Sequence, residues 1–197
     1  SIFPKVPLEF GEDGDRSLKI EKEASYIART NGKRSFPWRY FVISTNDEQL
    51  IENTMTYQLA QKNVLKDTSW IKPGLASWEW WNGATPYGAD VDFVAGCNLD
   101  TYKYFIDFAS KYGIEYILLD EGWSAGTWNI KEPIPGLDIP ELVRYGKERN
   151  VGLVLWTLWN PLDKELDEIL DVYEKWGIKG IKVDFMQRSD QYMVNFY

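Results

Sequence analysis

The sequence predicts an α/β fold, the first half (about four βα units) of a (β/α)8 TIM barrel. Short apolar runs at 114–120, 151–157 and 178–184 recur at a spacing of roughly 30 residues, and a helix-like segment follows each run. Two of the runs end in a carboxylate, Asp120 and Asp184. The carboxyl ends of barrel strands meet at one mouth, so both acids are expected there.

The residues before the barrel are expected to form the end of an N-terminal β-sandwich domain, over 1–45, and a helical linker, over 46–70. Residues 36–44 are aromatic and β-branched, which is typical of a strand. Asn46 or Asp47 can cap a helix from about residue 48 to residue 60. Residues 71–197 are then the partial catalytic barrel.

The barrel segment is predicted from alternating strand and helix signals. Asn98 can cap the first helix and Gly113 can end it, while Gly177 ends the third. The strands are expected at 72–81, 114–120, 151–157 and 178–184, and the helices at 99–112, 139–149, 163–176 and from residue 190. A closed barrel needs eight such units. The chain is therefore expected to be a fragment of a longer protein.

Composition narrows the classes of partner. The net charge of −8 disfavours nucleic acid and anionic membrane, and no apolar stretch is long enough to span a bilayer. Cys97 is the only cysteine, and there is no histidine, which excludes an intrachain disulfide and histidine-based triads within the chain. Aromatic residues make up 16% and include ten tryptophans. Such rings either stack on sugar faces or fill the core.

The adjacent acids Asp120 and Glu121 are the strongest local signal. Burying unpaired carboxylates is costly, and sugar hydroxyls are good hydrogen-bond donors to them. Gly122 allows a sharp turn, after which Trp123 can offer a stacking face. The alternative is an exposed loop with solvated acids. We expect a sugar-binding segment here, and paired acids at a strand mouth are typical of glycosidases.

Lys182 and Asp184 lie on the same side of their strand because side chains alternate. A lysine beside the aspartate would hold down its pKa and keep it ionised as a nucleophile. The alternative is a structural ion pair.

Two aromatic segments at strand ends are candidate walls of the site. Trp78 and Glu79 end the first strand, where they either line the site or form a hydrophobic plug with the acid turned outward. Trp159 and Asn160 follow the third strand and are expected near the mouth.

Together the motifs resemble glycoside hydrolase family 97. They are Asp67-Thr68-Ser69-Trp70-Ile71-Lys72-Pro73-Gly74, Trp78-Glu79-Trp80-Trp81, Leu119-Asp120-Glu121-Gly122-Trp123 and Lys182-Val183-Asp184-Phe185. The resemblance implies an N-terminal β-supersandwich, a (β/α)8 barrel and calcium dependence. Because Asp184 is present, it implies the retaining, α-galactosidase-like branch, with Asp184 as nucleophile and Asp120, Glu121 and Lys182 binding the sugar.

The same resemblance places the general acid/base glutamate and the calcium ligands outside this chain, so the chain alone is expected to be inactive. It also implies a bacterial periplasmic or secreted protein acting on an α-galactoside or related oligosaccharide. Three alternatives stay open: an α-glucosidase of the same family, a non-catalytic carbohydrate-binding protein, and a metal-dependent barrel aldolase or isomerase. Sugar specificity, linkage and oligomeric state are not fixed by the sequence.

Overall fold

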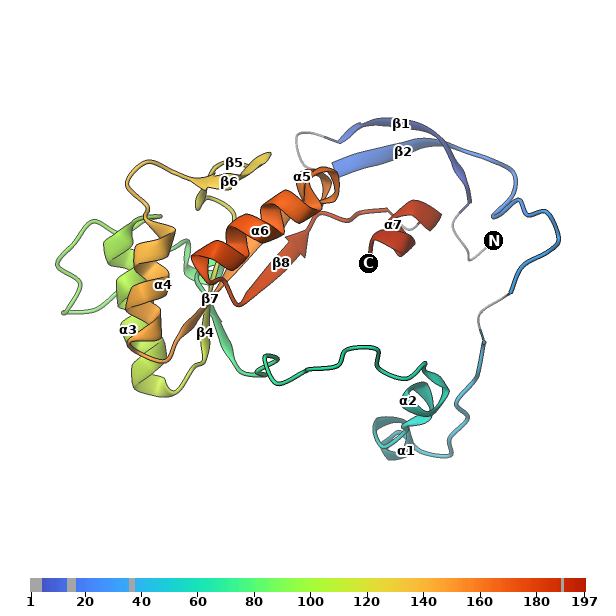
Figure 1. The fold of residues 1–197 in the computed structure, drawn as a ribbon, viewed down its shortest axis with the longest axis horizontal. Coiled ribbons are helices and arrows are strands. Elements are labelled where there is room, and N and C mark those ends of the chain that lie inside the picture. The colour runs from blue at the N-terminus through green and yellow to red at the C-terminus, as the bar shows by residue number, and fades with distance from the viewer. Residues whose placement is uncertain (1–4, 14–16, 36–37, 189) are drawn as a thin grey trace. The chain divides into compact units, whose positions relative to one another are not determined.

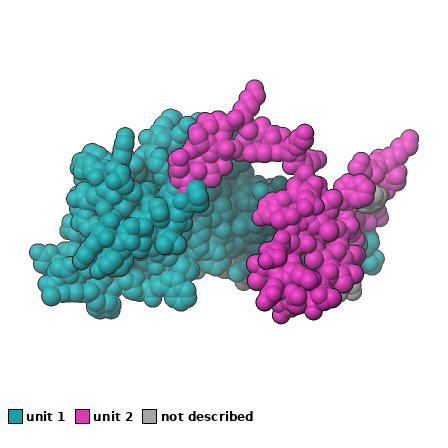
Figure 2. Space-filling view, turned by 90° about the horizontal axis from the view of Figure 1, so that it is seen from below, with its two compact units in different colours: residues 1–27, 73–197 teal, residues 28–72 magenta. Residues whose placement is uncertain are grey.

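A computed structural model describes residues 5–13, 17–35, 38–188 and 190–197 of the chain. The chain forms two compact units, shown in different colours in Figure 2. Unit 1 consists of Ser1–Ile27 and Pro73–Tyr197, and unit 2 consists of Ala28–Lys72. No described helix is long and apolar enough to cross a membrane.

A parallel four-stranded sheet organises unit 1 (Figure 1). Its strands lie side by side in chain order: β3 (Ala76–Trp78), β4 (Tyr116–Leu119), β7 (Gly152–Leu158) and β8 (Gly180–Asp184). Parallel neighbours of this kind require crossover connections, and helices provide them. The predicted α/β class with a parallel sheet is confirmed. All four carboxyl ends meet at one edge of the sheet, so the residues after them can form one site.

The crossover helices begin and end close to the predicted residues, except that the helix expected at 163–176 is two helices that meet at Glu165. Helix α3 (Leu99–Tyr112) is capped by Asn98, whose side chain accepts from the Thr101 N–H, and it ends at Gly113 with φ 70°. Helix α4 (Ile139–Lys147) is capped by the Asp138 side chain. The remaining helical segments of unit 1 are η1 (Glu79–Asn82, a 3-10 turn), α5 (Trp159–Lys164), α6 (Leu166–Trp176) and α7 (Gln191–Phe196).

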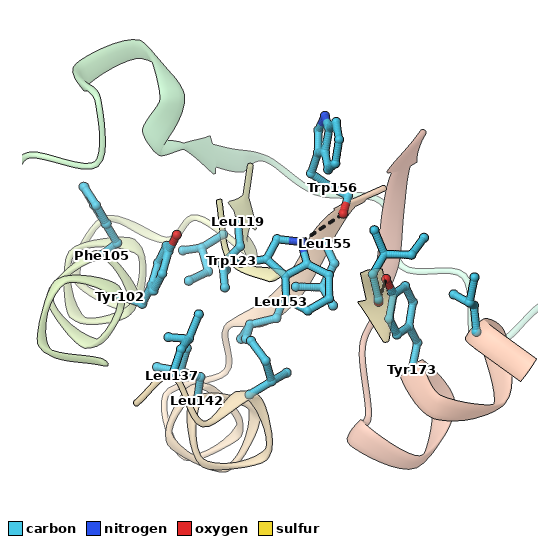
Figure 3. Close-up of a cluster of buried hydrophobic side chains, with 14 of the residues drawn as sticks. Tyr102, Phe105, Leu119, Trp123, Leu137, Leu142, Leu153, Leu155, Trp156 and Tyr173 are labelled. Atoms are coloured by element: carbon cyan, nitrogen blue, oxygen red, sulfur yellow. Dashed lines mark hydrogen bonds between the residues drawn. The ribbon is translucent and has the colours of Figure 1, made fainter. Parts of the chain in front are cut away.

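The hydrophobic core lies between the sheet and helices α3, α4 and α6 (Figure 3). Ile106, Leu142 and Ile169 each bring a fully buried side chain from one of these helices. Trp123 is also fully buried, and its indole contacts the rings of Tyr173 and Trp176. The core covers one face of the sheet, and Lys182 and Asp184 lie on the other face, in register with Trp156 and Leu158.

Several elements differ from the sequence prediction. Residues 38–44 are not a strand, and residues 36–37 of that prediction lie outside the described part. An aromatic run needs a partner strand to pair with, and the described residues offer it none. The helix expected at 48–60 is two short ones, α1 (Glu48–Ile51) and α2 (Met55–Leu59).

Two antiparallel hairpins were not predicted. One joins β1 (Pro7–Asp13) to β2 (Ser17–Glu23), and the other joins β5 (Ser124–Gly126) to β6 (Asn129–Pro133). The second lies in the Gly- and Pro-containing segment between the strand expected at 114–120 and the helix expected at 139–149, where no strand is expected. Its strands are short and polar, so they lack the alternating apolar pattern that marks a strand.

Candidate active site

Asp184 is the last residue of β8, and its side chain is 36% exposed. The Trp156 indole N–H donates to Asp184 Oδ2 at 2.9 Å, and the Lys182 ammonium lies 3.3 Å from the same oxygen. The carboxylate is thus held in place by neighbouring donors but stays open to a ligand.

The backbone after Asp184 is unusual. Phe185 has a φ of 61°, in a region that residues other than glycine rarely adopt. Its main-chain N–H donates to Asp184 Oδ1 at 2.8 Å. Each carboxylate oxygen therefore has a donor. Strained backbone of this kind is typical of functional sites.

The electrostatic surroundings favour the ionised form of Asp184. Partial burial alone would raise its pKa, but the hydrogen bonds from Trp156 and Phe185 and the charge of Lys182 outweigh that effect. The pKa of Asp184 consequently lies below the usual value for an aspartate. An anionic carboxylate at a strand end is what a nucleophile or an electrostatic stabiliser requires.

Lys182 bridges two carboxylates. Its ammonium is 2.6 Å from Asp120 Oδ2 and 3.3 Å from Asp184 Oδ2, and it lies 4.4 Å from the centre of the Trp78 ring. The position of the ammonium therefore depends on the aspartate at the end of β4 as well as on the one at the end of β8.

Asp120 follows β4 and is buried, with its side chain 7% exposed. The Trp78 indole N–H donates to Oδ2, and the Glu121 N–H donates to Oδ1 at 2.8 Å. The main-chain N–H of Asp120 donates to Glu79 Oε1 at 2.7 Å. Asp120 is thus fixed through its side chain and its main chain together, which suits a residue that must hold Lys182.

These side chains surround a cavity of about 220 Å³ at the carboxyl ends of the strands. The rings of Trp78 and Trp80 stack at 5.2 Å with an angle of 16° between their planes, so they offer a flat apolar wall. The lining residues are Trp78, Trp80, Asp120, Glu121, Trp156, Lys182, Asp184 and Phe185. The charged lining consists of three carboxylates and one ammonium. Aromatic walls beside carboxylates suit a neutral polyhydroxy ligand, whereas a phosphosugar would be repelled.

Four of the predicted site residues do not line this cavity. Trp123 is in the core, where its indole N–H donates to the Trp156 carbonyl at 2.9 Å, and its ring is not available for stacking (Figure 3). Gly122 has a φ of 122°, which turns the chain and directs Trp123 inward. The other predicted residues, Trp78, Asp120, Glu121, Lys182 and Asp184, come together as expected.

Trp159 and Asn160 begin α5 and are 2% and 7% exposed. The Trp159 ring packs against Phe196. Because β7 continues to Leu158, these residues point into the packing around α5 rather than into the cavity. Glu79 lies behind the cavity, where it holds the main chain of Asp120.

Three lining residues were not predicted as site residues: Trp80, Trp156 and Phe185. Trp156 pairs in register with Lys182. Paired residues of neighbouring strands face the same way, so strand register was the signal that could have identified Trp156. Trp156 is also fully buried and belongs to the same core cluster as Trp123 (Figure 3), so residue type alone indicates a core residue rather than a site residue.

The described residues do not fit the calcium ion that the family resemblance implies. No group of three or more His, Cys, Asp or Glu side chains among them could hold a metal ion. Asp120 and Asp184 already share the Lys182 ammonium as their cation. Calcium needs several oxygen ligands in one shell, which this arrangement lacks.

Comparison with curated proteins reveals two related chains. One is a retaining alpha-galactosidase of Bacteroides thetaiotaomicron, 40% identical over 195 residues, which are 98% of this chain and 29% of that protein. The other is a probable retaining alpha-galactosidase of Streptomyces bingchenggensis, 36% identical over 174 residues, which are 85% of this chain and 26% of that protein. The chain thus spans less than a third of the length of either relative.

Among solved structures, a glycoside hydrolase family 97 enzyme of Pseudoalteromonas sp. in complex with acarbose is similar, with a TM-score of 0.60 and 26% identity. The match covers 74% of this chain and 27% of that one. A variant of the enzyme in complex with panose gives a TM-score of 0.61 at 26% identity, over 75% and 27% of the two chains. The family model described as Glycoside hydrolase 97 matches residues 80–197, more than half of the chain. The chain belongs to glycoside hydrolase family 97.

Proposed function

We propose that this chain carries the nucleophile of a retaining α-galactosidase. The observation that carries the proposal is the placement of Asp184, a half-exposed and electrostatically stabilised carboxylate at the rim of an aromatic-walled cavity. The two related proteins, a retaining alpha-galactosidase and a probable retaining alpha-galactosidase, support the proposal.

The reaction would proceed by double displacement. Asp184 attacks the anomeric carbon, a bond forms between that carbon and the carboxylate oxygen, and the glycosidic C–O bond breaks. A glutamate about 5 Å from the nucleophile in such enzymes gives its proton to the leaving oxygen and then takes one from the attacking water. This acid/base glutamate is proposed to lie outside the chain, so the chain alone should be inactive.

The remaining lining residues would bind the sugar. The wall formed by Trp78 and Trp80 would stack on its apolar face, and Asp120 and Glu121 would accept hydrogen bonds from its hydroxyls. Lys182 would donate to the sugar while it holds both aspartates.

The test is replacement of Asp184 by Asn in the intact protein, with an activated aryl α-galactoside as substrate. Loss of the nucleophile should lower kcat/KM by at least about a thousandfold. The matched control is Asp167→Asn, the same change at an exposed position of α6, which should keep the wild-type rate. An Asp184→Asn variant as active as the control would overturn the proposal.

A second candidate is an α-glucosidase. The solved complexes of the structural relative contain acarbose and panose, which favours testing glucosides as well. Parallel assays on aryl α-galactoside and α-glucoside decide between them. A purely carbohydrate-binding protein would bind α-galactosides without hydrolysing either substrate.

We further infer the organisation around the site. Residues 71–197 would be half of a (β/α)8 barrel, preceded by the end of a β-sandwich at 1–45 and a linker at 46–70. Support comes from β3 and β8, each of which pairs on one side alone among the described residues, so the sheet can continue at both edges.

The proposed calcium would take its ligands from residues outside this chain. Chelation followed by calcium titration of the intact protein tests this inference. Activity that survives complete chelation would refute it. We also propose a periplasmic or secreted bacterial location, which cell fractionation of the source organism would test.

A further inference from the structure

Glu79 is a buried acid that contacts the site from behind. It begins η1, directly after Trp78, and is 6% exposed. Its Oε1 accepts the main-chain N–H of Asp120 at 2.7 Å and the Tyr102 hydroxyl at 3.3 Å. Burial raises the pKa of Tyr102, so this hydroxyl keeps its proton and acts as donor. Glu79 therefore connects α3 to the end of β4.

Keeping a carboxyl group at this place is energetically costly. Among the described residues, Glu79 Oε2 is buried and has no hydrogen-bond partner. Desolvation is the main reason that the pKa of Glu79 is raised to about 7, although the Asp120 N–H lowers it in part. A side chain that served only to fill space would avoid this cost with an apolar group.

We propose that Glu79 is a positioning residue for the reaction proposed above, because it fixes the main chain of Asp120 and, through Asp120, the ammonium of Lys182 beside Asp184. Trp78 and Glu79, adjacent in sequence, hold the side chain and the main chain of Asp120 respectively. The inference rests on the proposed function, since Glu79 itself does not line the cavity.

The contacts form one continuous path. Glu79 Oε1 is 2.7 Å from Asp120 N, Asp120 Oδ2 is 2.6 Å from Lys182 Nζ, and Lys182 Nζ is 3.3 Å from Asp184 Oδ2. A displacement of Asp120 would therefore move the cation that lies beside the nucleophile. Misplacement of a catalytic constellation by about 1 Å can cost on the order of a hundredfold in rate.

Two variants of the intact protein separate the effect of the length of the Glu79 side chain from the effect of its charge. Glu79→Gln keeps the chain length and an acceptor oxygen for the Asp120 N–H but removes the charge. Glu79→Asp keeps the charge but is one methylene shorter, so the oxygen no longer reaches the amide. If positioning is the role, Glu79→Gln should stay within about threefold of the wild-type kcat/KM, and Glu79→Asp should fall at least about tenfold.

The assay uses an aryl α-galactoside for kcat and KM, and an activated fluoro-galactoside to count the sites that can be labelled covalently. A positioning defect in Glu79→Asp lowers the labelling rate and kcat while every site is still labelled in the end. A merely structural defect lowers the fraction of labelled sites and leaves KM and the labelling rate of the remainder unchanged. Hydrogen exchange at the Asp120 amide should be faster in Glu79→Asp than in Glu79→Gln.

The inference is supported if kcat/KM falls in Glu79→Asp but not in Glu79→Gln, while every site of Glu79→Asp is labelled in the end and hydrogen exchange at its Asp120 amide is faster. It is overturned if Glu79→Asp equals wild type, if both variants lose activity equally, or if Glu79→Asp does not fold, since the role would then be structural. Failure of the proposed function has a different result: Asp184→Asn would keep its activity, or wild type would not hydrolyse the galactoside. In that case hydrogen exchange still tests whether Glu79 accepts the hydrogen bond from the Asp120 main-chain N–H.

Discussion

Replacing Glu79 by Gln should make the stability of the protein less dependent on pH. The ionised form of Glu79 is disfavoured in the folded state, where its pKa is raised from 4.5 to about 7 by burial. The folded state therefore binds more protons than the unfolded state between these values, and wild-type stability falls as the pH rises through this window. A shift of this size corresponds to about 3 kcal/mol, since one pKa unit is about 1.4 kcal/mol.

The free energy of unfolding of Glu79→Gln should exceed that of wild type by little near pH 4.5 and by at most about 3 kcal/mol at pH 8, because Gln carries no charge to bury. Urea unfolding of both proteins between pH 4.5 and pH 8 measures the difference. Glu174→Gln, at an exposed position of α6, controls for loss of one negative charge. A difference between Glu79→Gln and wild type that stays constant over this range would refute the reasoning.

Three further predictions concern the site and the core. Trp156→Phe removes the indole donor to Asp184, so the pKa of that carboxyl should rise and the acid limb of the kcat/KM profile should move to higher pH; an unmoved limb contradicts this. Lys182→Met leaves two carboxylates without their shared cation and should cost about 2 kcal/mol of stability as well as activity, whereas unchanged unfolding would show that the bridge is weak. Trp123→Ala should lower the free energy of unfolding by about 3–5 kcal/mol, because it empties a fully buried position. Trp80→Ala removes a ring that is 58% exposed, so it should raise KM with little effect on thermal unfolding. Equal melting temperatures for the two variants would contradict the different placement of the two rings.

Helices α3 and α4 and strands β4, β7 and β8 could be predicted because their local signals agree with their tertiary environment. Asn98 begins α3 with a side-chain cap, and Gly113 ends it in the left-handed conformation. Both signals depend on local chemistry. The aromatic segment at 38–44 looks equally strand-like, but strand formation depends on a partner that the segment itself does not specify. The β5–β6 hairpin is the opposite case, since pairing forms there without a local strand pattern.

Within the site, the acids at the strand ends and Lys182 were predicted, whereas Trp156 in β7 was missed and Trp123 and Trp159 were misplaced. Lys182 and Asp184 share a face because alternation fixes their direction. The direction of Trp123 depends on the backbone of Gly122, and the burial of Trp159 depends on where β7 ends; neither can be read from residue type. The role of Trp156 depends on register with β8, which becomes known once the strands are paired.

The account depends on Asp184 as the residue that attacks a sugar bound in the cavity at the strand ends. The most direct measurement is mass spectrometry of the intact protein after reaction with an activated fluoro-galactoside and digestion. We expect one additional glycosyl group, bound to Asp184. A label on another carboxylate, or no label while the galactoside is hydrolysed, would contradict the assignment.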